Sequence, residues 1–336
     1  MAKDGVAFIV KIVISIAAWY IFSALATLYN KIVYTEKCPC SPAALTLGQM
    51  LAGAIFAGAS ILAGVRSYQP MSREQAKSVI LLSIGHVLGN FATNMSIMAV
   101  AASLTHTIKA AEPVFAVILT RIFIGEKGSP LMYASLGIIV LGVGMASSGN
   151  LSMNWTGLIT ALISNLCFSS RNVLSKLSYG KHSFDETNLF FHMSWLGALI
   201  WIPFSGIQMY QFLISPDDGV TVADAAINGP IKIGGGCLTV VFLASVFHWL
   251  YNQCSFLVLS QMSPISHAVA NCMKRAVVIL SALMYFHTPV NSVTGSGTFL
   301  ALFGVAAYSR YKLKQQKEKK PAPAPVAPAP PTGTQV

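Results

Sequence analysis

Apolar residues fall into ten long runs along the chain, and short polar or Gly/Pro-containing segments separate them. Each run is close to the roughly 20 residues that an α-helix needs to cross the hydrocarbon core of a bilayer. The pattern therefore predicts an all-α membrane protein with ten transmembrane helices. The runs cover residues 6–30, 43–65, 77–100, 102–123, 131–148, 153–175, 187–209, 232–260, 263–286 and 291–310.

The composition excludes most other classes of protein. Of the 336 residues, 54% are hydrophobic and 10% are charged, against about 25% charged in an ordinary soluble domain. This excludes a soluble globular enzyme and a disordered protein. After the last run, the tail at 312–336 is first basic and then rich in Pro and Ala. We expect the basic part to lie in solvent or against anionic lipid headgroups, and the Pro/Ala part to be disordered.

The net charge of +11 is unevenly distributed over the predicted loops. An even number of helices puts both termini on one side of the membrane. Fourteen Lys and Arg residues lie on that side or at its helix ends, whereas the opposite loops hold three, Lys31, Lys37 and Lys232. Because cytosolic loops carry the excess of Lys and Arg, both termini are predicted to face the cytosol or an equivalent compartment. The positive charge therefore indicates membrane topology and no nucleic-acid partner.

Two of the predicted helices share a sequence pattern. THTIKAAEPVFAVIL, from Thr105, aligns without a gap with SHAVANCMKRAVVIL, from Ser266, at an offset of 161 residues. The chain thus divides into two five-helix halves, 1–149 and 150–311. Because each half has an odd number of helices, the halves must be inverted in the membrane, and such repeats place a site near the bilayer midplane between them.

Charged residues inside a membrane-spanning helix are costly, and each is a candidate for function. Lys109 lies within the fourth helix, with Glu112 almost one turn later, and Lys274 and Arg275 lie within the ninth. A structural ion pair between Lys109 and Glu112 is one interpretation. Lys274 and Arg275 have no acid in their own helix, so an anionic ligand explains them more simply. Arg offers a planar fork of donors to phosphate or carboxylate, and Lys a compact charge.

Polar residues recur at helical spacing on four predicted helices, and together these faces predict a polar cavity. Hydrogen bonds between helices would explain any one such face, but here four of them accompany three cations. The residues are His267 and Asn271 in the ninth helix, Ser83, His86, Asn90, Thr93 and Asn94 in the third, His248, Tyr251, Asn252 and Ser255 in the eighth, and Asn165, Ser169, Asn172 and Lys176 in the sixth.

Motifs for catalysis or metal binding are missing from the sequence. It has no nucleophile elbow, no P-loop and no histidines at metal-ligand spacing, so we expect no enzyme, no metal and no cofactor. His106 and His267 are interpreted as hydrogen-bonded packing residues. Cys38 and Cys40 form a C-P-C turn, interpreted as two unpaired thiols, with a disulfide or a metal site as the alternative.

Three motifs resemble the plastidic phosphate translocators of the drug/metabolite transporter superfamily. They are THTIKAAEP at 105–113, RNVLSK at 171–176 and SPISHAVANCMKR at 263–275, within a resemblance that runs over about residues 8–312. The resemblance implies ten helices in an inverted five-plus-five repeat and exchange of phosphorylated C3, C5 or C6 compounds for inorganic phosphate. It also implies a plastid or plastid-surrounding membrane, with an endomembrane as the alternative.

The resemblance assigns the cations a role. By motif, Lys109, Lys274 and Arg275 match the residues that bind the phosphate group in that family. Four further polar residues are expected to support the site: Asn94, Glu112, His248 and Asn271.

The resemblance also bears on the other end of the substrate. Thr93 and Tyr251 match positions that contact this end, and Asn90 stands where the triose-phosphate branch has a His. The strings LGNFATNMS, NCMKR and HTPV are most similar to the phosphoenolpyruvate/phosphate branch. We therefore expect an antiporter of inorganic phosphate and a phosphorylated C3 compound, with phosphoenolpyruvate as the first choice.

Three other functions are alternatives. The first is exchange of triose phosphate or 3-phosphoglycerate, or dual specificity. The second is a nucleotide-sugar transporter of the same superfamily, which would need additional groups that read the base and the sugar. The third is a membrane receptor or scaffold whose charges lock the helices together, and a measurement of flux separates it from a transporter.

Overall fold

The structure is a computed structural model, and it describes residues 2–34, 40–125, 128–150, 153–179, 184–214, 235–261 and 264–319. This part of the chain is helical and contains no strands. Its helices are α1 (Ala2–Ile32), α2 (Pro42–Leu62), α3 (Arg73–Ala99), α4 (Ala102–Lys109), α5 (Glu112–Ile124), α6 (Pro130–Gly149), α7 (Trp155–Tyr179), α8 (Glu186–Ile214), α10 (Gly235–Gln261), α11 (Pro264–Tyr285) and α12 (Ser292–Lys319).

Each predicted apolar run corresponds to helix, and the two largest differences concern the fourth run and the last. The run 102–123 is divided into α4 and α5, and the last helix continues beyond residue 310 to Lys319. The residues after 311 are mostly Lys, Gln and Glu, which favour helix, and no Pro or Gly follows until Pro321. Residues 232–234, predicted as helix, and the Pro/Ala-rich part of the tail lie outside the described residues.

Serine caps fix where several helices begin. Ser41, Ser72 and Ser129 precede α2, α3 and α6, and the side chain of each accepts a hydrogen bond from the backbone N–H three residues later. Each bond satisfies one of the N–H groups that have no partner within the helix. Gln75 completes a capping box with Ser72 at the start of α3.

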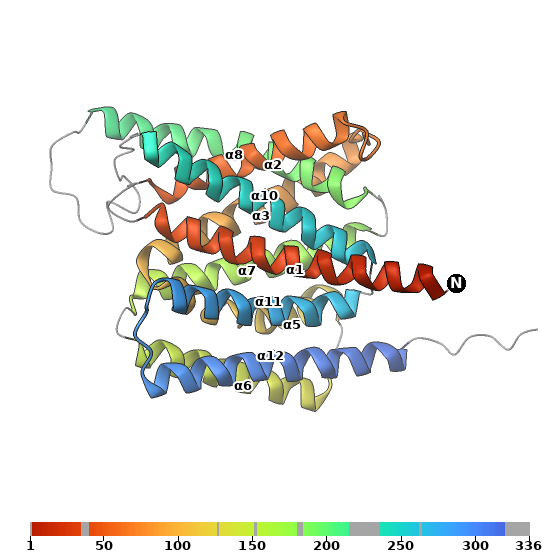
Figure 1. Ribbon diagram of the computed structural model, residues 1–336, viewed down its shortest axis with the longest axis vertical. Coiled ribbons are helices and arrows are strands. Elements are labelled where there is room, and N and C mark those ends of the chain that lie inside the picture. The colour runs from red at the N-terminus through yellow and green to blue at the C-terminus, as the bar shows by residue number, and fades with distance from the viewer. Residues whose placement is uncertain are drawn as a thin grey trace, which may run out of the picture.

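The helices lie side by side, with their axes broadly aligned (Figure 1). The closest pairs are α6 with α12, α3 with α7, α1 with α10, and α2 with α8. Each pair joins a helix from the N-terminal half of the chain to one from the C-terminal half. The N-terminal end of α1 and the C-terminal end of α12 lie at the same end of the bundle (Figure 1).

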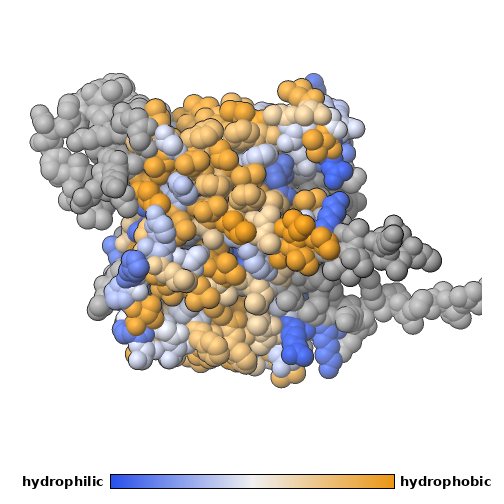
Figure 2. All heavy atoms as spheres, viewed as in Figure 1, coloured by the Kyte–Doolittle hydropathy of each residue, from blue (hydrophilic) through white to orange (hydrophobic). Residues whose placement is uncertain are grey.

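The outer surface matches a membrane environment. Figure 2 shows apolar side chains gathered over the middle of the helices, with hydrophilic residues towards their two ends. Large apolar side chains such as Ile55, Leu141 and Phe299 are exposed on the surface of the bundle. Six helices in the described part of the chain are long and apolar enough to cross a membrane: Val10–Ile32, Pro42–Leu62, Arg73–Ala99, Pro130–Gly149, Thr187–Gly206 and Cys237–Ser255.

Polar side chains gather inside the bundle instead. The buried ones include His86, Asn90, Lys109, His248 and Arg275. Ionisable groups in a membrane protein face the protein interior because hydrocarbon cannot solvate them. A polar site is therefore expected in the interior of the bundle, between α3, α4, α7, α10 and α11.

Candidate substrate-binding site

The divided helix is the first element of the site. Pro113 lies in the first turn of α5 and has no N–H to donate to the preceding turn. The chain tightens at Ala110 and Ala111, whose N–H groups reach Thr107 O at 3.0 Å and Ile108 O at 3.0 Å. The break places Lys109 in the last turn of α4 and Glu112 in the first turn of α5. Each charge thus lies at the helix end that its sign stabilises.

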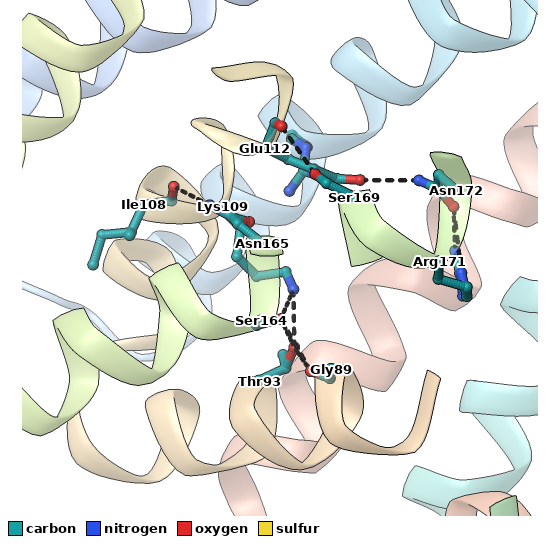
Figure 3. Close-up of polar contacts among 11 residues, drawn as sticks. Gly89, Thr93, Ile108, Lys109, Glu112, Ser164, Asn165, Ser169, Arg171 and Asn172 are labelled. Atoms are coloured by element: carbon teal, nitrogen blue, oxygen red, sulfur yellow. Dashed lines mark hydrogen bonds and ion pairs between the residues drawn. The ribbon is translucent and has the colours of Figure 1, made fainter. Parts of the chain in front are cut away.

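Helix α7 supplies hydrogen-bond donors to the backbone at this break. Asn165 Nδ2 donates to Ile108 O at 3.1 Å, and Ser169 Oγ donates to Glu112 O at 3.2 Å (Figure 3). Irregular backbone within a membrane protein needs such partners because lipid offers none. The polar face predicted on the sixth apolar run therefore has a structural task at the break.

Lys109 is buried, with 7% of its surface exposed. Its Nζ donates to Thr93 Oγ1 at 2.9 Å and to Ser164 Oγ at 2.6 Å (Figure 3). The same Nζ lies 4.5 Å from the centre of the Phe168 ring, a distance at which the ring attracts a cation. All of these partners are neutral, so the charge of Lys109 is solvated but not neutralised by them.

Glu112 forms an ion pair with Arg275 of α11, in which Arg275 Nη2 donates to Glu112 Oε2. The structure does not contain the Lys109–Glu112 pair that the spacing in α4 and α5 allowed. The acid that pairs with Arg275 lies on a different helix, so the lack of acids within α11 did not mean that Arg275 is unpaired. Arg275 is thereby neutralised, whereas no carboxylate pairs with Lys109 in the described part of the chain.

Lys274 lies beside aromatic rings. Its Nζ is 5.0 Å from the centre of the Trp19 ring and 5.7 Å from that of Tyr251. Tyr20, next to Trp19, donates its hydroxyl to Ala270 O at 2.6 Å and so ties α1 to α11 one turn before Lys274. Among the described residues, Lys274 has no ion pair and no hydrogen bond from its ammonium group.

Arg171, within the motif RNVLSK, is a further member of the cluster that helical spacing did not indicate. Arg171 Nη1 donates to His86 Nδ1 at 2.9 Å, and Nη2 donates to Asn172 Oδ1 at 2.9 Å. Its guanidinium is 5.0 Å from the Phe168 ring, which also faces Lys109. Asn172 Nδ2 in turn donates to Glu112 Oε1 at 3.4 Å (Figure 3). Arg171 therefore belongs to the same cluster as Lys109 and Glu112.

The residues expected at the other end of the substrate lie in two places. Thr93 is in direct contact with Lys109, and Tyr251 lies near Lys274. Asn90 donates from Nδ2 to His86 O at 2.8 Å, one turn earlier on α3. His248 connects the two places, since its ring is 5.1 Å from Tyr251 and 6.3 Å from His86.

The cluster thus forms a continuous series of side-chain contacts that joins α4, α7, α5 and α11. Lys109 and Arg171 share the ring of Phe168, and Arg171 leads through Asn172 and Glu112 to Arg275. Such a cluster can bind an anion, because it contains more positive than negative charge in surroundings with little water.

Comparison with known proteins identifies the family of this chain. The sequence model of the Triose-phosphate Transporter family matches residues 10–309. The chain belongs to this family. The resemblance seen in its motifs is therefore confirmed, and the chain is a transporter rather than an enzyme.

Two relatives in plants illustrate the range of this family. A phosphoenolpyruvate/phosphate translocator 3 from chloroplasts of Oryza sativa subsp. japonica is 37% identical, and the match covers 88% of this chain and 73% of that protein. A triose phosphate/phosphate translocator from non-green plastids of Brassica oleracea var. botrytis is 35% identical, with coverage of 88% and 71%. A protein of known crystal structure has the same fold, with 14% identity, a TM-score of 0.55 and coverage of 92% of this chain and 99% of that one.

Asn94, expected to support the substrate site of the transporter, makes its side-chain hydrogen bonds to residues of α1 and α2. Its Oδ1 accepts from Asn30 Nδ2 at 3.2 Å, and its Nδ2 donates to Gln49 Oε1 at 3.1 Å and to Thr46 Oγ1 at 3.0 Å. Gln49 Nε2 closes a ring of three amides by donating to Asn30 Oδ1 at 3.1 Å. This buried ring joins α1, α2 and α3, as expected for hydrogen bonding between membrane helices.

Three further expectations concern single residues. Asn271 is half-buried on α11, one turn before Lys274 and Arg275. His106 lies with its Nε2 3.1 Å from Thr27 Oγ1, which agrees with a hydrogen-bonded packing role. The side chain of His267 lies outside the described part of the chain.

Cys40 is a free, buried thiol in the connection before α2. Burial raises the pKa of the Cys40 thiol to about 11, so it remains protonated near neutral pH. Cys40 forms no disulfide, and Cys38, its alternative partner in the C-P-C turn, lies outside the described residues. In that part of the chain no three His, Cys, Asp or Glu side chains are grouped so that they could hold a metal ion.

Proposed function

We propose that this transporter exchanges inorganic phosphate for a phosphorylated C3 compound by alternating access, with phosphoenolpyruvate as the preferred counter-substrate. The observation that carries the proposal is the unbalanced positive charge inside the bundle. Lys109 and Lys274 have no carboxylate partner among the described residues, because Glu112 is paired with Arg275. A phosphate group carries about −1.5 to −2 charge at neutral pH and would balance two ammonium groups.

The proposed roles follow the chemistry of each side chain. Lys109, Lys274 and Arg275 bind the phosphoryl group. Arg275 uses one of its two terminal nitrogens for Glu112, which leaves further donors for a phosphate oxygen. The three-carbon end is contacted by Thr93, Tyr251 and Asn90, and Glu112 and Asn271 are supporting polar residues.

His248 adds a polar atom to the proposed site. Its Nε2 is buried and has no hydrogen-bond partner in the described part of the chain. Leaving such an atom unpaired costs about 1–3 kcal/mol. A substrate oxygen or hydroxyl beside Tyr251 would provide the missing partner, so we assign His248 to the three-carbon end.

Electrostatic repulsion provides a reason for obligatory exchange. Two unit charges about 4 Å apart interact by about 4 kcal/mol at an effective dielectric constant of 20. Closing the site around uncompensated cations and excluding water from it is therefore unfavourable. A bound phosphate or phosphorylated compound removes this penalty, so the loaded carrier reorients readily and the empty carrier does not.

We propose that the two halves, 1–149 and 150–311, form the inverted five-plus-five repeat that alternating access uses. The packing of the helices supports this. With α4 and α5 counted as one helix, the equivalent helices of the two halves are α1 and α7, α2 and α8, α3 and α10, α4–α5 and α11, and α6 and α12. Replacing each helix by its equivalent should turn one observed pair into another observed pair. The pair α3–α7 then corresponds to α1–α10, and α2–α10 corresponds to α3–α8. The pairs α6–α12, α2–α8 and α4–α11 each correspond to themselves.

The named relatives support a plastid location. Both come from plastids, so we propose a plastid or plastid-surrounding membrane for this chain. The excess of Lys and Arg at the ends of α2, α3 and α12 supports placing both termini on the cytosolic side. The basic end of α12 would then lie at the headgroups of that leaflet and attract anionic lipids.

Triose phosphate or 3-phosphoglycerate is the second candidate for the counter-substrate. The identities to a phosphoenolpyruvate and to a triose phosphate translocator are similar, 37% and 35%. We favour phosphoenolpyruvate because Asn90 stands at a position where, by the resemblance described above, the triose-phosphate branch of the family has a His.

The test is uptake of radiolabelled phosphate into proteoliposomes that hold the purified protein. The vesicles are preloaded with phosphoenolpyruvate, 3-phosphoglycerate, dihydroxyacetone phosphate or glucose 6-phosphate. The proposal predicts the fastest uptake with internal phosphoenolpyruvate. Equal rates with dihydroxyacetone phosphate would contradict the preferred substrate and retain the exchange mechanism. No uptake with any of them, from folded protein, would contradict phosphate exchange itself.

A further inference from the structure

The ammonium group of Lys109 rests on a small triangle of oxygen atoms. Two of them are the hydroxyls of Thr93 and Ser164, which lie 2.7 Å apart, and the third is the backbone carbonyl of Gly89. Thr93 Oγ1 lies 2.8 Å and Ser164 Oγ lies 3.0 Å from that carbonyl (Figure 3). Helix α3 supplies Gly89 and Thr93, and α7 supplies Ser164.

Counting protons fixes the direction of these hydrogen bonds. An ammonium group can only donate, and each hydroxyl has one proton and two lone pairs. Both hydroxyls must therefore accept from Lys109. Their two protons are used within the triangle, towards Gly89 O or towards the other hydroxyl. Two of the three N–H groups of Lys109 are thus held in place, and the third is left for another acceptor.

The two hydroxyls differ in their access to a substrate. Ser164 has 0% of its surface exposed, whereas Thr93 is partly accessible. Ser164 therefore cannot contact a substrate and can influence one only through the lysine. Its bond to Lys109 is also the shorter of the two, 2.6 Å against 2.9 Å.

Gly89 is what allows this triangle to form. A Cβ at position 89 would meet the Phe168 ring at 3.0 Å, and Phe168 is the ring that faces Lys109. The absence of a side chain lets α3 and α7 approach until Ser164 can reach the carbonyl of Gly89. The triangle therefore depends on close helix packing, a common use of small residues between membrane helices.

We propose that Ser164 is a positioning residue for phosphate binding, a role that rests on the proposed function of Lys109. Ser164 holds the ammonium so that its third N–H is directed at a phosphate oxygen before the substrate arrives. Preorganised donors bind more tightly because they lose less freedom on binding. Loss of this acceptor frees the lysine side chain and weakens phosphate binding, while the reorientation of the loaded carrier is little changed.

Phosphate self-exchange in proteoliposomes tests the proposal, with the wild type, Ser164→Ala and Ser164→Cys compared by KM and kcat. Cys keeps the approximate volume but is a weak acceptor. Hydrogen bonds to charged groups are the stronger ones, so both variants should raise the KM for phosphate about 10-fold, with kcat within about 3-fold of wild type. Ser164→Thr, which keeps the hydroxyl, should stay closer to wild type than either. If Ser164→Ala does not fold, Ser164→Cys alone decides.

Ser135→Ala is the matched control, since Ser135 is a buried serine whose hydroxyl donates to Leu131 O of its own helix at 2.9 Å. This variant should exchange phosphate like the wild type. A second measurement is the change in Tm without phosphate. Ser164→Ala should lower Tm less in a Lys109→Met background than in the wild type, because no ammonium then needs the acceptor.

The outcomes distinguish a failure of the positioning role of Ser164 from a failure of the proposed function. A KM within about 2-fold of wild type in folded Ser164→Ala and Ser164→Cys would overturn the positioning role and leave phosphate exchange intact. A fall in kcat with an unchanged KM would overturn it as well. Absence of phosphate exchange in the wild type would overturn the proposed function, and the positioning role with it.

Discussion

At the scale of single residues, the three cations of the proposed site have different partners. Arg275 has an acid partner in Glu112, Lys109 has two hydroxyls, and Lys274 has two aromatic rings. Their different partners imply different costs of burial without a ligand. Lys274 has the least compensation among the described residues and should depend most on a bound anion.

The Glu112→Gln variant tests the ion pair. It removes the charge that neutralises Arg275, and breaking a buried pair from one side costs about 3–5 kcal/mol. Because the side chain of Glu112 is 20% exposed, we expect a value near the lower end, seen as a fall in Tm. Added phosphate should raise the Tm of Glu112→Gln more than that of the wild type, because it supplies the missing negative charge. Glu74→Gln, at an exposed position of α3, is the control, and equal phosphate effects in all three proteins would contradict the prediction.

The Asn90→His variant tests whether Asn90 recognises the three-carbon end of the substrate. Asn90 donates to the carbonyl of His86, and an imidazole at this position presents a different arrangement of donors and acceptors. We expect the ratio of kcat/KM for phosphoenolpyruvate to that for dihydroxyacetone phosphate to fall about 10-fold, the size of one hydrogen bond. Competition between the two compounds during phosphate uptake measures this ratio. An unchanged ratio would show that Asn90 does not set the specificity.

At the scale of helices, glycines determine how closely α6 and α12 pack. A Cβ at Gly142 would collide with the backbone of Ala301, and one at Gly297 would collide with the backbone of Ala146. The two helices therefore meet backbone to backbone, at one edge of the bundle (Figure 1).

The Gly142→Leu variant should separate this pair of helices. Overpacking a close contact costs about 1–3 kcal/mol or more, and here the neighbour is backbone that cannot turn aside. We expect a clear loss of Tm and of the yield of folded protein. Gly137→Leu on the same helix has open space around its Cβ position and should behave like the wild type. Equal Tm values for the two variants would contradict the close contact.

Helices were easier to predict from the sequence than the partners of their side chains. The apolar runs predicted the helices because hydrocarbon requires long apolar stretches with every backbone group satisfied. The break at Ala110 and Ala111 was missed, although Pro113 was a visible signal for it. The pairing of Arg275 with Glu112 could not be predicted, because it depends on how α5 and α11 pack.

The polar faces were only partly informative for the same reason. Helical spacing selected Asn165, Ser169 and Asn172 on α7, but Ser164 and Phe168 stand one position earlier and touch Lys109. Periodicity identifies a polar stripe and does not say which neighbours it meets. It also grouped Asn94 with the site, whereas the hydrogen bonds of that residue tie α1, α2 and α3 together.

At the scale of the whole molecule, the fold surrounds a charged interior with a lipid-compatible exterior. Apolar side chains cover the middle of the bundle (Figure 2), and the cations lie within it. Such an arrangement is expensive to maintain without an anion. We therefore propose that neutralisation of the cations by a bound anion permits the site to close, which couples the chemistry of the site to the motion of the carrier.

The most direct test of this claim compares phosphate uptake into proteoliposomes that contain phosphate with uptake into empty ones. Wild type and Lys274→Ala are measured side by side, after confirming that both are folded. We expect rapid uptake by the wild type into loaded vesicles, uptake at least about 10-fold slower into empty vesicles, and loss of exchange in Lys274→Ala. Equal uptake into empty and loaded vesicles, or wild-type exchange by Lys274→Ala, would contradict it.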